Sequence, residues 1–427
     1  MSSEQQSLSE VEKEEENNFR KPYILKREGR EKPDDWKVKP LGDLLELEYG
    51  NSLPKKERED GPHPVYGSNG RSGWHSDYHI EAPGIIVGRK GVNLGIKWSD
   101  EDFNVIDTAY FVNSSSLEVE DVDLKFLYYN FLDFDLDRLK SGSAVPGLNR
   151  NDFYDETIIF PPIKEQKKIA GVLSSLDRKI ETNNRITELL EEMAQTLFKS
   201  WFIDFEPYED FKQSELGEIP ESFEVKELGD LIDSGRGYSY TSDYLDKEKQ
   251  EEESYPMINL KNIKEGGGFR TDGYKYYTEE EMKDRYRISE GDLIVAITDL
   301  TQEGRVIGSP AMIPELESDM NIISQDTAKI EPEEIPKEFL YYLLRTESFL
   351  GHAKSHATGT TVLHLSLTSI GDFRFAVPPK EKIEEFSSIA EKIINKKFSN
   401  IEENKKLEEM RDTLLPKLMS GEIRVND

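Results

Sequence analysis

Apolar and small uncharged side chains recur at heptad spacing through residues 161–202. The seam positions are Ile169, Leu173, Leu176, Ile180, Asn183, Thr187, Leu190, Ala194, Leu197 and Trp201. Such a narrow seam is typical of a helix that packs lengthwise against another helix in a coiled coil. Pro161 and Pro162 open the stretch, and proline is tolerated at the start of a helix but not in its interior. The pattern therefore predicts one long helix.

This helical stretch is repeated near the end of the chain. Asn183 falls on Asn400, an offset of 217 residues, and Leu190–Met193 falls on Leu407–Met410 with the same offset. The second copy, residues 378–421, keeps seam positions at Phe386, Ala390, Ile393, Leu407, Leu414 and Leu418, with Lys397, Asn404 and Arg411 among them. A repeat of this length predicts a tandem duplication with a second long helix.

Two such helices in one chain are expected to pair antiparallel about a pseudo-two-fold axis. In that arrangement only central residues meet their own repeat mates, and Asn183 and Asn400 both lie near the middle of their helices. A buried Asn in a seam can set the register of a coiled coil. We therefore predict an Asn183–Asn400 contact that sets the register; the alternative is that both side chains are solvated.

Each helix follows a globular segment, residues 36–160 and residues 223–377. Leu41–Leu44 and Leu228–Leu231 both read LGDL, so the duplication includes these segments. Short β-rich runs, a few helical runs and turns alternate in both, which indicates an α+β fold. Val65–Gly70 is expected to be a strand entering a turn, and Gly84–Gly91 a buried strand followed by a tight basic loop. The other runs expected as strands are Thr108–Val112, Thr157–Phe160, Asp292–Ile297 and Phe375–Val377, and the runs expected as helices are Asp123–Leu132 and Glu338–Leu344.

The remaining stretches have little to bury. Residues 1–35 are expected to be a disordered acidic tail with a basic lead-in, because they are polar and charged. Residues 203–222 contain Gly217, Pro220 and several acidic residues, which is typical of an exposed connector. Residues 422–427 are expected to be a short C-terminal tail.

The composition excludes several classes of protein. The chain of 427 residues has no cysteine, which rules out disulfides and cysteine zinc sites. It has no apolar run of membrane-spanning length, and its start is unlike a signal peptide, so a cytoplasmic protein is expected. The net charge of −31 favours a high-salt cytoplasm or, equally, an ordinary acidic protein, and it repels nucleic acid unless basic residues cluster locally.

Catalytic signatures are missing. The sequence has no Gly-x-x-x-x-Gly-Lys-Ser/Thr phosphate loop and no dinucleotide-binding glycine pattern, and Gly266–Gly268 lacks the lysine and the preceding strand. Phe160 and Val377 precede the two Pro-Pro pairs, where an adenine methyltransferase would need Asn or Asp. His352 and His356 stand four residues apart, which suits a metal, but a solvated helix face explains them better because no Glu follows the first His.

Several motifs together resemble the specificity (S) subunit of type I restriction–modification enzymes. They are the duplicated segments, the loop SGSAVPGLN, the run PPIKEQKKIAGVL leading into a heptad helix, SWFIDFEP, and ELGEIPESF before the second copy. The resemblance covers residues 36–421. After Pro379 the second copy reads KEKIEEF where the first has IKEQKKI, which puts equivalent partner contacts of the two helices in doubt.

The resemblance implies that two target-recognition domains each read half of a bipartite, asymmetric site in double-stranded DNA. It also implies that the antiparallel helices act as a ruler and dock two methyltransferase (M) subunits, which two helicase–nuclease restriction (R) subunits join. S-adenosylmethionine, ATP and Mg²⁺ would serve those partner subunits, and the chain itself is expected to hold no cofactor and no metal and to have no catalytic residue. A helix of about 36 residues is roughly 54 Å long, which suits a spacer between two reading heads.

Sequence is read at base edges, which calls for basic and amide side chains on the loops of a rigid body. The candidate DNA-binding residues are Asn69, Arg71, Arg89, Lys90, Ser143, Thr298, Thr360 and Thr361. The alternative is that the glycines nearby simply permit turns and that SGSAVPGLN is a packing loop. Two other functions also stay open: a coiled-coil scaffold without a DNA role, and a self-contained methyltransferase or nuclease with an unfamiliar site.

Overall fold

The computed structural model describes residues 22–91, 93–142, 146–241, 245–246, 255–278, 283–316, 318 and 321–425. The predicted tail before residue 22 therefore lies outside the described residues. The chain divides into two compact units, Met1–Ile180 with Lys406–Asp427 (unit 1) and Glu181–Lys405 (unit 2). Each unit contains a globular segment of mixed strands and helices and one part of both long helices, so the predicted α+β class and the two-fold organisation are confirmed.

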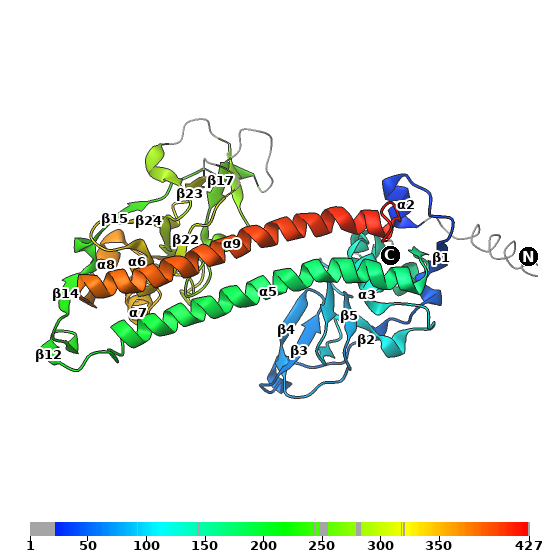
Figure 1. Ribbon diagram of the computed structural model, residues 1–427, viewed down its shortest axis with the longest axis horizontal. Coiled ribbons are helices and arrows are strands. Elements are labelled where there is room, and N and C mark those ends of the chain that lie inside the picture. The colour runs from blue at the N-terminus through cyan, green and yellow to red at the C-terminus, as the bar shows by residue number, and fades with distance from the viewer. Residues whose placement is uncertain are drawn as a thin grey trace, which may run out of the picture. The chain divides into compact units, whose positions relative to one another are not determined.

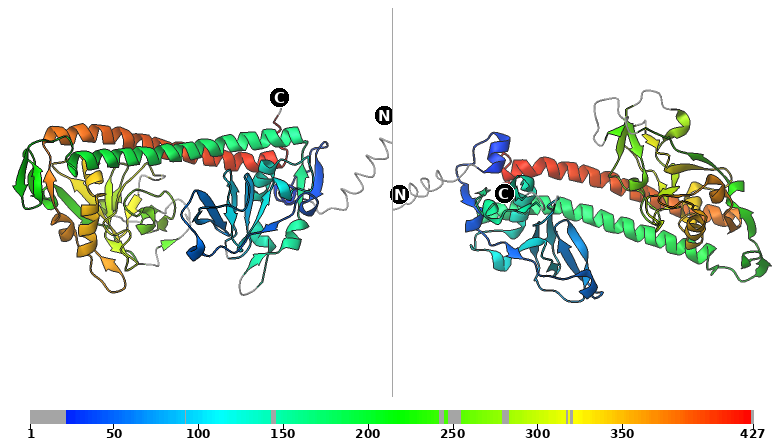
Figure 2. Two further views of the ribbon diagram at one scale, coloured as in Figure 1. Left: turned by 90° about the horizontal axis from the view of Figure 1, so that it is seen from below. Right: turned by 180° about the vertical axis from the view of Figure 1, so that it is seen from behind.

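The two long helices are α5 (Ile163–Phe202) and α9 (Lys380–Met419), shown in green and in orange to red (Figure 1). In unit 1, Ile169 of α5 shares a buried cluster with Leu418 of α9. In unit 2, the ring of Phe198 of α5 lies 5.2 Å from that of Phe386 of α9. Residues with higher numbers on α5 therefore contact residues with lower numbers on α9, which confirms the antiparallel pairing. Figure 2 shows the two helices side by side.

The polar residues that interrupt the second heptad pattern have partners across the seam. Arg411 donates to Asp177 at 3.1 Å in unit 1. In unit 2, Lys397 forms an ion pair with Glu191. Paired in this way, charged groups can occupy a helix seam without the full cost of desolvation.

Unit 1 is built on two small sheets, with strand orders β2-β8-β5-β6 and β4-β3-β7. Its elements are α2 (Tyr23–Glu28), β1 (Lys37–Pro40), β2 (Glu48–Tyr49), β3 (His63–Gly67), β4 (Gly70–His75), β5 (Gly84–Gly88), β6 (Ile96–Ser99), β7 (Asn104–Val105), β8 (Ala109–Asn113), α3 (Leu124–Leu132), β9 (Lys140–Ser141), β10 (Gly147–Leu148), α4 (Arg150–Tyr154) and β11 (Thr157–Phe160). Every residue of β5 is buried, as its unbroken apolar run predicts for a strand with neighbours on both sides. The antiparallel pair β1–β11 closes the segment just before α5 begins.

The helix α3 attaches this globular segment to the long helix. The hydroxyl of Tyr129 on α3 donates to Asp177 of α5 at 2.6 Å, and Arg411 of α9 binds the other oxygen of the same carboxylate. Burial raises the pKa of the neighbouring Tyr128 to about 12. Tyr129 itself is fully buried, so the hydrogen bond to Asp177 satisfies a hydroxyl that has no access to water.

Unit 2 repeats the first sheet with the order β15-β24-β20-β22, and its second sheet, β16-β18-β17-β23-β19, repeats β4-β3-β7 with one further strand at each edge. Its elements are β12 (Phe211–Ser214), β13 (Gly217–Pro220), β14 (Glu224–Glu227), β15 (Ile232–Arg236), β16 (Leu245–Asp246), β17 (Tyr255–Ile258), β18 (Lys275–Tyr277), β19 (Arg287–Ile288), β20 (Leu293–Ala296), β21 (Thr298–Asp299), β22 (Pro310–Met312), β23 (Asn321–Ile323), β24 (Thr327–Pro332), α6 (Lys337–Leu343), α7 (Glu347–His356), β25 (Leu363–His364), α8 (Leu367–Gly371) and β26 (Arg374–Val377). The pair β14–β26 closes this segment before α9 begins, as β1–β11 does in unit 1.

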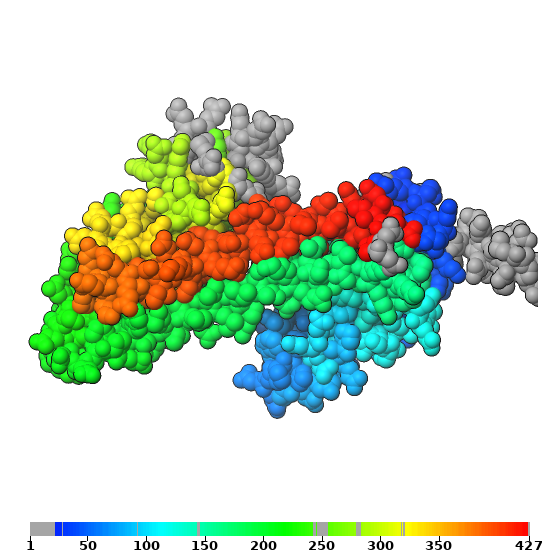
Figure 3. All heavy atoms as spheres, in the orientation of Figure 1, coloured from blue at the N-terminus to red at the C-terminus, as the bar shows by residue number. Residues whose placement is uncertain are grey.

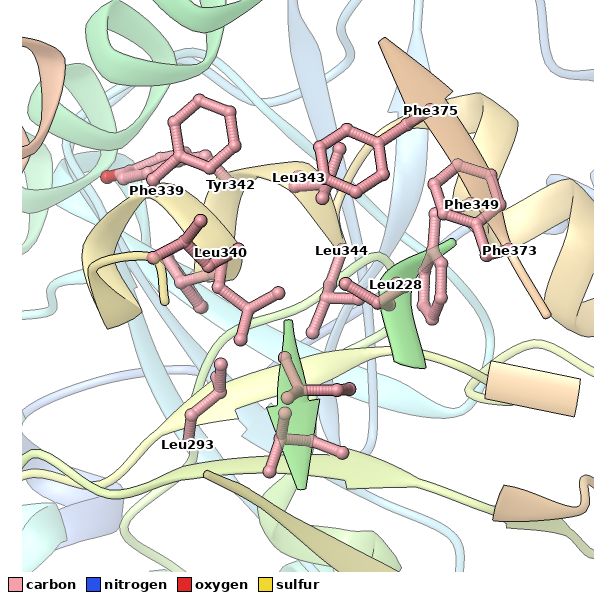
Figure 4. Close-up of a cluster of buried hydrophobic side chains, with 14 of the residues drawn as sticks. Leu228, Leu293, Phe339, Leu340, Tyr342, Leu343, Leu344, Phe349, Phe373 and Phe375 are labelled. Atoms are coloured by element: carbon pink, nitrogen blue, oxygen red, sulfur yellow. The ribbon is translucent and has the colours of Figure 1, made fainter. Parts of the chain in front are cut away.

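The core of unit 2 is rich in aromatic rings. Figure 4 shows Phe339 and Tyr342 of α6 on one side of this cluster and Phe349, Phe373 and Phe375 on the other. Phe198 and Phe202 of α5 join the same cluster, with their rings 5.1 and 5.2 Å from that of Phe339. The long helix is therefore part of the core of unit 2 rather than a separate rod.

The flanking stretches contain more structure than their composition suggests. Residues 22–35 are not a solvated lead-in: α2 buries Ile24 and Leu25, and Arg27 donates to Asp133 at 2.7 Å. Apolar neighbours inside a charged run were enough to dock this short helix. The connector at 203–222 contains the hairpin β12–β13, which buries Ile219.

The C-terminal end is also held by contacts. Arg424 donates to Asp35 at 2.7 Å and to Glu165 at 2.7 Å, so residues up to 425 are part of unit 1.

Candidate nucleic-acid interface

In unit 1 three loops meet where β5 ends. The backbone N–H of Arg89 donates to Thr108 O at 2.9 Å, and that of Lys90 donates to Ser68 Oγ at 3.1 Å. Leu148 N donates to Arg89 O at 2.9 Å, which joins the 146–149 loop to the same place. The backbone network thus brings together the predicted residues Arg89 and Lys90 and the turn that carries Asn69.

The predicted polar side chains of this surface are accessible. Asn69 and Lys90 are exposed and Arg89 is half-buried. Lys90 forms an ion pair with Asp107 at 3.3 Å. Arg71 lies on β4, with its guanidinium carbon 4.6 Å from the centre of the Trp74 ring, and that ring is 42% exposed. Ser143 lies outside the described residues.

The same surface contains a cluster that the sequence analysis missed. The guanidinium carbons of Arg89 and Arg150 lie 4.9 and 5.3 Å from the centre of the Tyr49 ring, which is 50% exposed. Tyr110 packs edge-on against that ring at 5.0 Å. Hydrogen bonding to Tyr110 and Arg150 lowers the pKa of Tyr49. These residues come from β2, the β5–β6 loop, α4 and β8, so no local sequence signal reveals the cluster.

Unit 2 has the same backbone arrangement with different side chains. Ile297 N donates to Asp326 O at 2.9 Å, and Leu365 N donates to Ile297 O at 2.9 Å. These two bonds repeat the pattern at Arg89, so Ile297 is its counterpart. Thr298 pairs with His364 as Lys90 pairs with Gly147, so Thr298 is the counterpart of Lys90.

The three threonines predicted to bind DNA in unit 2 differ in exposure. Thr298 is only 2% exposed, and its hydroxyl lies 3.5 Å from His364 Nδ1. The pairing of β21 with β25 covers Thr298, so its hydroxyl does not face solvent in this structure, and its role in DNA binding stays a prediction. Thr360 and Thr361 are exposed beside Gly359, whose φ of +138° suits glycine.

The turn that follows Thr298 presents an apolar tip. Leu300 is 71% exposed, while the preceding Asp299 is 3% exposed. The Asp299 carboxylate accepts hydrogen bonds from Thr301 N and Val306 N, both at 2.8 Å. Burial by itself would raise the pKa of Asp299, but these hydrogen bonds outweigh burial and hold the pKa below its usual range. The buried carboxylate therefore fixes the turn that carries Leu300.

The two central Asn residues of the helix pair are in contact in unit 2. Asn400 Nδ2 donates to the backbone oxygen of Asn183 at 3.2 Å and to Thr187 Oγ1 at 3.1 Å. Asn183 Nδ2 donates to Glu403 and Asn404, both at 2.9 Å. Both Asn side chains are 1% exposed, so neither is solvated. Their role in setting the register stays a prediction.

The remaining motifs serve local structure. His352 Nε2 donates to Ser369 O at 2.7 Å, and His356 Nδ1 donates to His352 O at 2.8 Å. Among the residues described, no group of three or more His, Asp or Glu is placed to hold a metal. Gly266 O accepts from Arg345 Nε at 3.2 Å in a turn of three glycines with positive φ. No helix in the described part of the chain is long and apolar enough to cross a membrane.

Comparison with known proteins identifies relatives over most of the chain. The family model described as "Type I restriction modification DNA specificity domain" matches twice, at residues 33–192 and 220–412. The type I restriction enzyme MjaIX specificity subunit of Methanocaldococcus jannaschii is 30% identical over 321 residues, which cover 71% of this chain and 70% of that protein. The MjaVIII specificity subunit of the same organism is 26% identical, with 96% and 97% of the two chains covered.

A solved structure agrees in fold. The type I restriction–modification S subunit from M. genitalium has a TM-score of 0.55 at 18% identity, covering 90% of this chain and 96% of that one. The two matches to the family model coincide with the duplicated segments, each with its globular part and most of the helix that follows it. The chain therefore belongs to the type I restriction–modification DNA specificity family.

Proposed function

We propose that this chain is the DNA specificity subunit of a type I restriction–modification assembly, in which each unit reads one half of a bipartite, asymmetric site. The supporting observation is the pair of equivalent loops. The same two backbone hydrogen bonds hold Arg89 in unit 1 and Ile297 in unit 2, and Lys90 and Thr298 take matching places in the strand pairing. A conserved frame with different side chains suits the recognition of two unequal DNA sequences, because base choice depends on the side chains presented to base edges.

Two methyltransferase subunits and two restriction subunits are the proposed protein partners. The long helices leave one side uncovered, as the space-filling view shows for α9 and part of α5 (Figure 3). Exposed apolar side chains occur on α5, where Met193 is 63%, Leu189 41% and Ile186 37% exposed. Met410, the repeat mate of Met193, is 51% exposed on α9. Exposed apolar side chains that gather on one helix are typical of a protein interface.

In this proposal the chain itself performs no chemistry. Methylation of adenine and ATP-dependent cleavage belong to the partner subunits, which would hold S-adenosylmethionine, ATP and Mg²⁺. The assembly would act in the cytoplasm, where the DNA lies. Neither the scaffold nor the self-contained enzyme explains why two similar frames carry different loop side chains.

A genome-wide map of methylated adenine, with and without this gene, tests the proposal. We expect one split, asymmetric motif to lose its methylation when the gene is deleted and to regain it when the gene is restored. An unchanged map, together with failure of the chain to copurify with a methyltransferase, would contradict the proposal. Methylation by the purified chain alone would contradict its non-catalytic role.

A further inference from the structure

The cluster of Tyr49, Arg89 and Arg150 (the Arg–Tyr–Arg cluster) is held by hydrogen bonds and ring contacts but keeps donors available. Arg89 Nη1 donates to Asp107 O at 2.9 Å, and in the part of the chain that the structure describes Arg89 has no carboxylate partner. Arg150 donates to Tyr154 through Nε and to Glu46 through Nη2. A guanidinium has five N–H donors, so both arginines retain donors beside an exposed tyrosine. Such an arrangement suits an anion with several acceptor oxygens.

Unit 1 contains a second tyrosine flanked by two arginines, and there the arginines serve only the structure. Arg27 and Arg138 lie 5.7 and 4.4 Å from the ring of Tyr23. Arg138, however, binds Glu156 through both terminal nitrogens at 2.7 Å, and Arg27 binds Asp133 at 2.7 Å. Carboxylates take the charge of both arginines there, so that arrangement offers no comparable site for an anion.

The Arg–Tyr–Arg cluster has no counterpart at the equivalent positions of unit 2. Ile297 replaces Arg89, as the backbone pattern shows. Arg150 is the first residue of α4 and Leu367 the first residue of the matching helix α8, so an apolar side chain replaces the second arginine. In the strand pairing, the place of Tyr49 opposite Tyr110 is taken by Arg236 opposite Ala328. A single arginine stands where unit 1 has three interacting groups.

We propose that the Arg–Tyr–Arg cluster binds a backbone phosphate of the half-site that unit 1 reads, and that unit 2 holds its half-site without this anchor. This inference rests on the proposed function. The net charge of −31 makes such an anchor necessary, because an acidic chain binds a polyanion only where cations are grouped. Protein oxygens and aromatic rings fix the orientation of both guanidinium groups. A phosphate is the same at every nucleotide, so fixed donors suit it better than they suit base edges, which vary with sequence. In this proposal the exposed amide side chain of Asn69 and the loop around it read the base edges.

The test uses the complex with its methyltransferase subunit and duplex DNA carrying the methylated motif. We expect Arg89→Ala and Arg150→Ala each to weaken binding about tenfold on every sequence and to make the salt dependence shallower by about one phosphate contact. Tyr49→Phe should have a smaller effect. In phosphate-ethylation interference, one modification within one half-site should hinder the wild type and no longer hinder the variants.

The matched control is Arg138→Ala, which removes an arginine from the Tyr23 arrangement and should leave the salt dependence unchanged. Loss of discrimination at one base pair with an unchanged salt dependence would overturn the proposal, since it would make the cluster a base reader. Unchanged binding, interference lost in both half-sites, or loss of the methyltransferase subunit from the complex would overturn it as well. If the wild-type complex itself fails to bind the motif, the proposed function fails instead.

Discussion

The loop ends of units 1 and 2 share a backbone and differ in the polarity of their side chains. Arg89 is half-buried beside an exposed tyrosine, whereas Ile297, held by the same two hydrogen bonds, is fully buried in the core of unit 2. Backbone hydrogen bonds therefore preserve the position of a loop while the packing around it decides whether the position faces solvent. Duplication can in this way produce two recognition surfaces from one frame.

The helix seams differ in a similar way. In unit 1 the charged pair Asp177–Arg411 is partly exposed, with 27% of each side chain accessible. In unit 2 Glu191 lies between Lys397 and Arg345, and these side chains are 15%, 14% and 11% exposed. Burial lowers the pKa of Arg345 to about 10. Unit 2 thus depends on one carboxylate to balance two buried cations.

The largest expected effect comes from exchanging the equivalent loop residues. Ile297→Arg should lower the free energy of unfolding by about 4 kcal/mol, because it forces a charge into an apolar core. Arg89→Ile should change it by less than about 0.5 kcal/mol, because that position is already partly solvated. Urea unfolding of the purified chain measures the free energy of unfolding of both variants. Similar losses in the two variants would contradict the claim that the two loop ends differ in burial.

Removal of the buried carboxylate is the next test. Glu191→Ala should cost about 3 kcal/mol, since it leaves two buried cations unpaired. Asp177→Ala should cost about 2 kcal/mol, because its ion pair with Arg411 is screened by solvent but the buried hydroxyl of Tyr129 loses its acceptor. The exposed neighbour Glu192 provides the control as Glu192→Ala. If Asp177→Ala proves the more harmful in urea unfolding, the seams do not differ as described.

The central Asn residues test the register. Asn183→Leu should cost about 1 kcal/mol, because Glu403 and Asn404 lose a buried donor. It should also admit a second register, which cysteine pairs introduced across the seam will detect by disulfide formation, since the chain has no cysteine of its own. Asn395→Leu, at an exposed position of α9, is the control. Unchanged stability with a single register would refute the predicted role.

The last test concerns the turn that presents Leu300, where the expected loss is no larger than that of Asn183→Leu. Because the pKa of Asp299 is lowered in the folded state, the carboxylate stabilises the fold fully above its usual pKa of 3.8, and this contribution is lost as the pH falls through the folded-state value. Asp299→Asn should therefore cost about 1 kcal/mol near neutral pH, and the difference from wild type should shrink below pH 4. The exposed Asp210→Asn is the control, and a difference independent of pH would contradict the assignment.

Much of the architecture was predictable because it rests on long, repeated patterns. The heptads of α5 and α9, the buried run of β5 and the pairing of the helices all follow from periodicity that no single contact can override. The short helix α2 was missed because six residues give too little periodicity, although Ile24 and Leu25 are buried. The burial of Thr298 was missed because it depends on β25, which lies 65 residues further along the chain.

The amino-acid sequence by itself determined the duplication, the two long helices, the α+β class and the family resemblance, because these are properties of pattern and repeat. Only the tertiary structure decided which loop residues face solvent and which meet. Tyr49, Arg89 and Arg150 become neighbours through strand pairing and the docking of α4, and Ile297 is buried by a core drawn from α5, α6 and α9. Such contacts join residues far apart in the chain, and their energy comes from packing that no local pattern records.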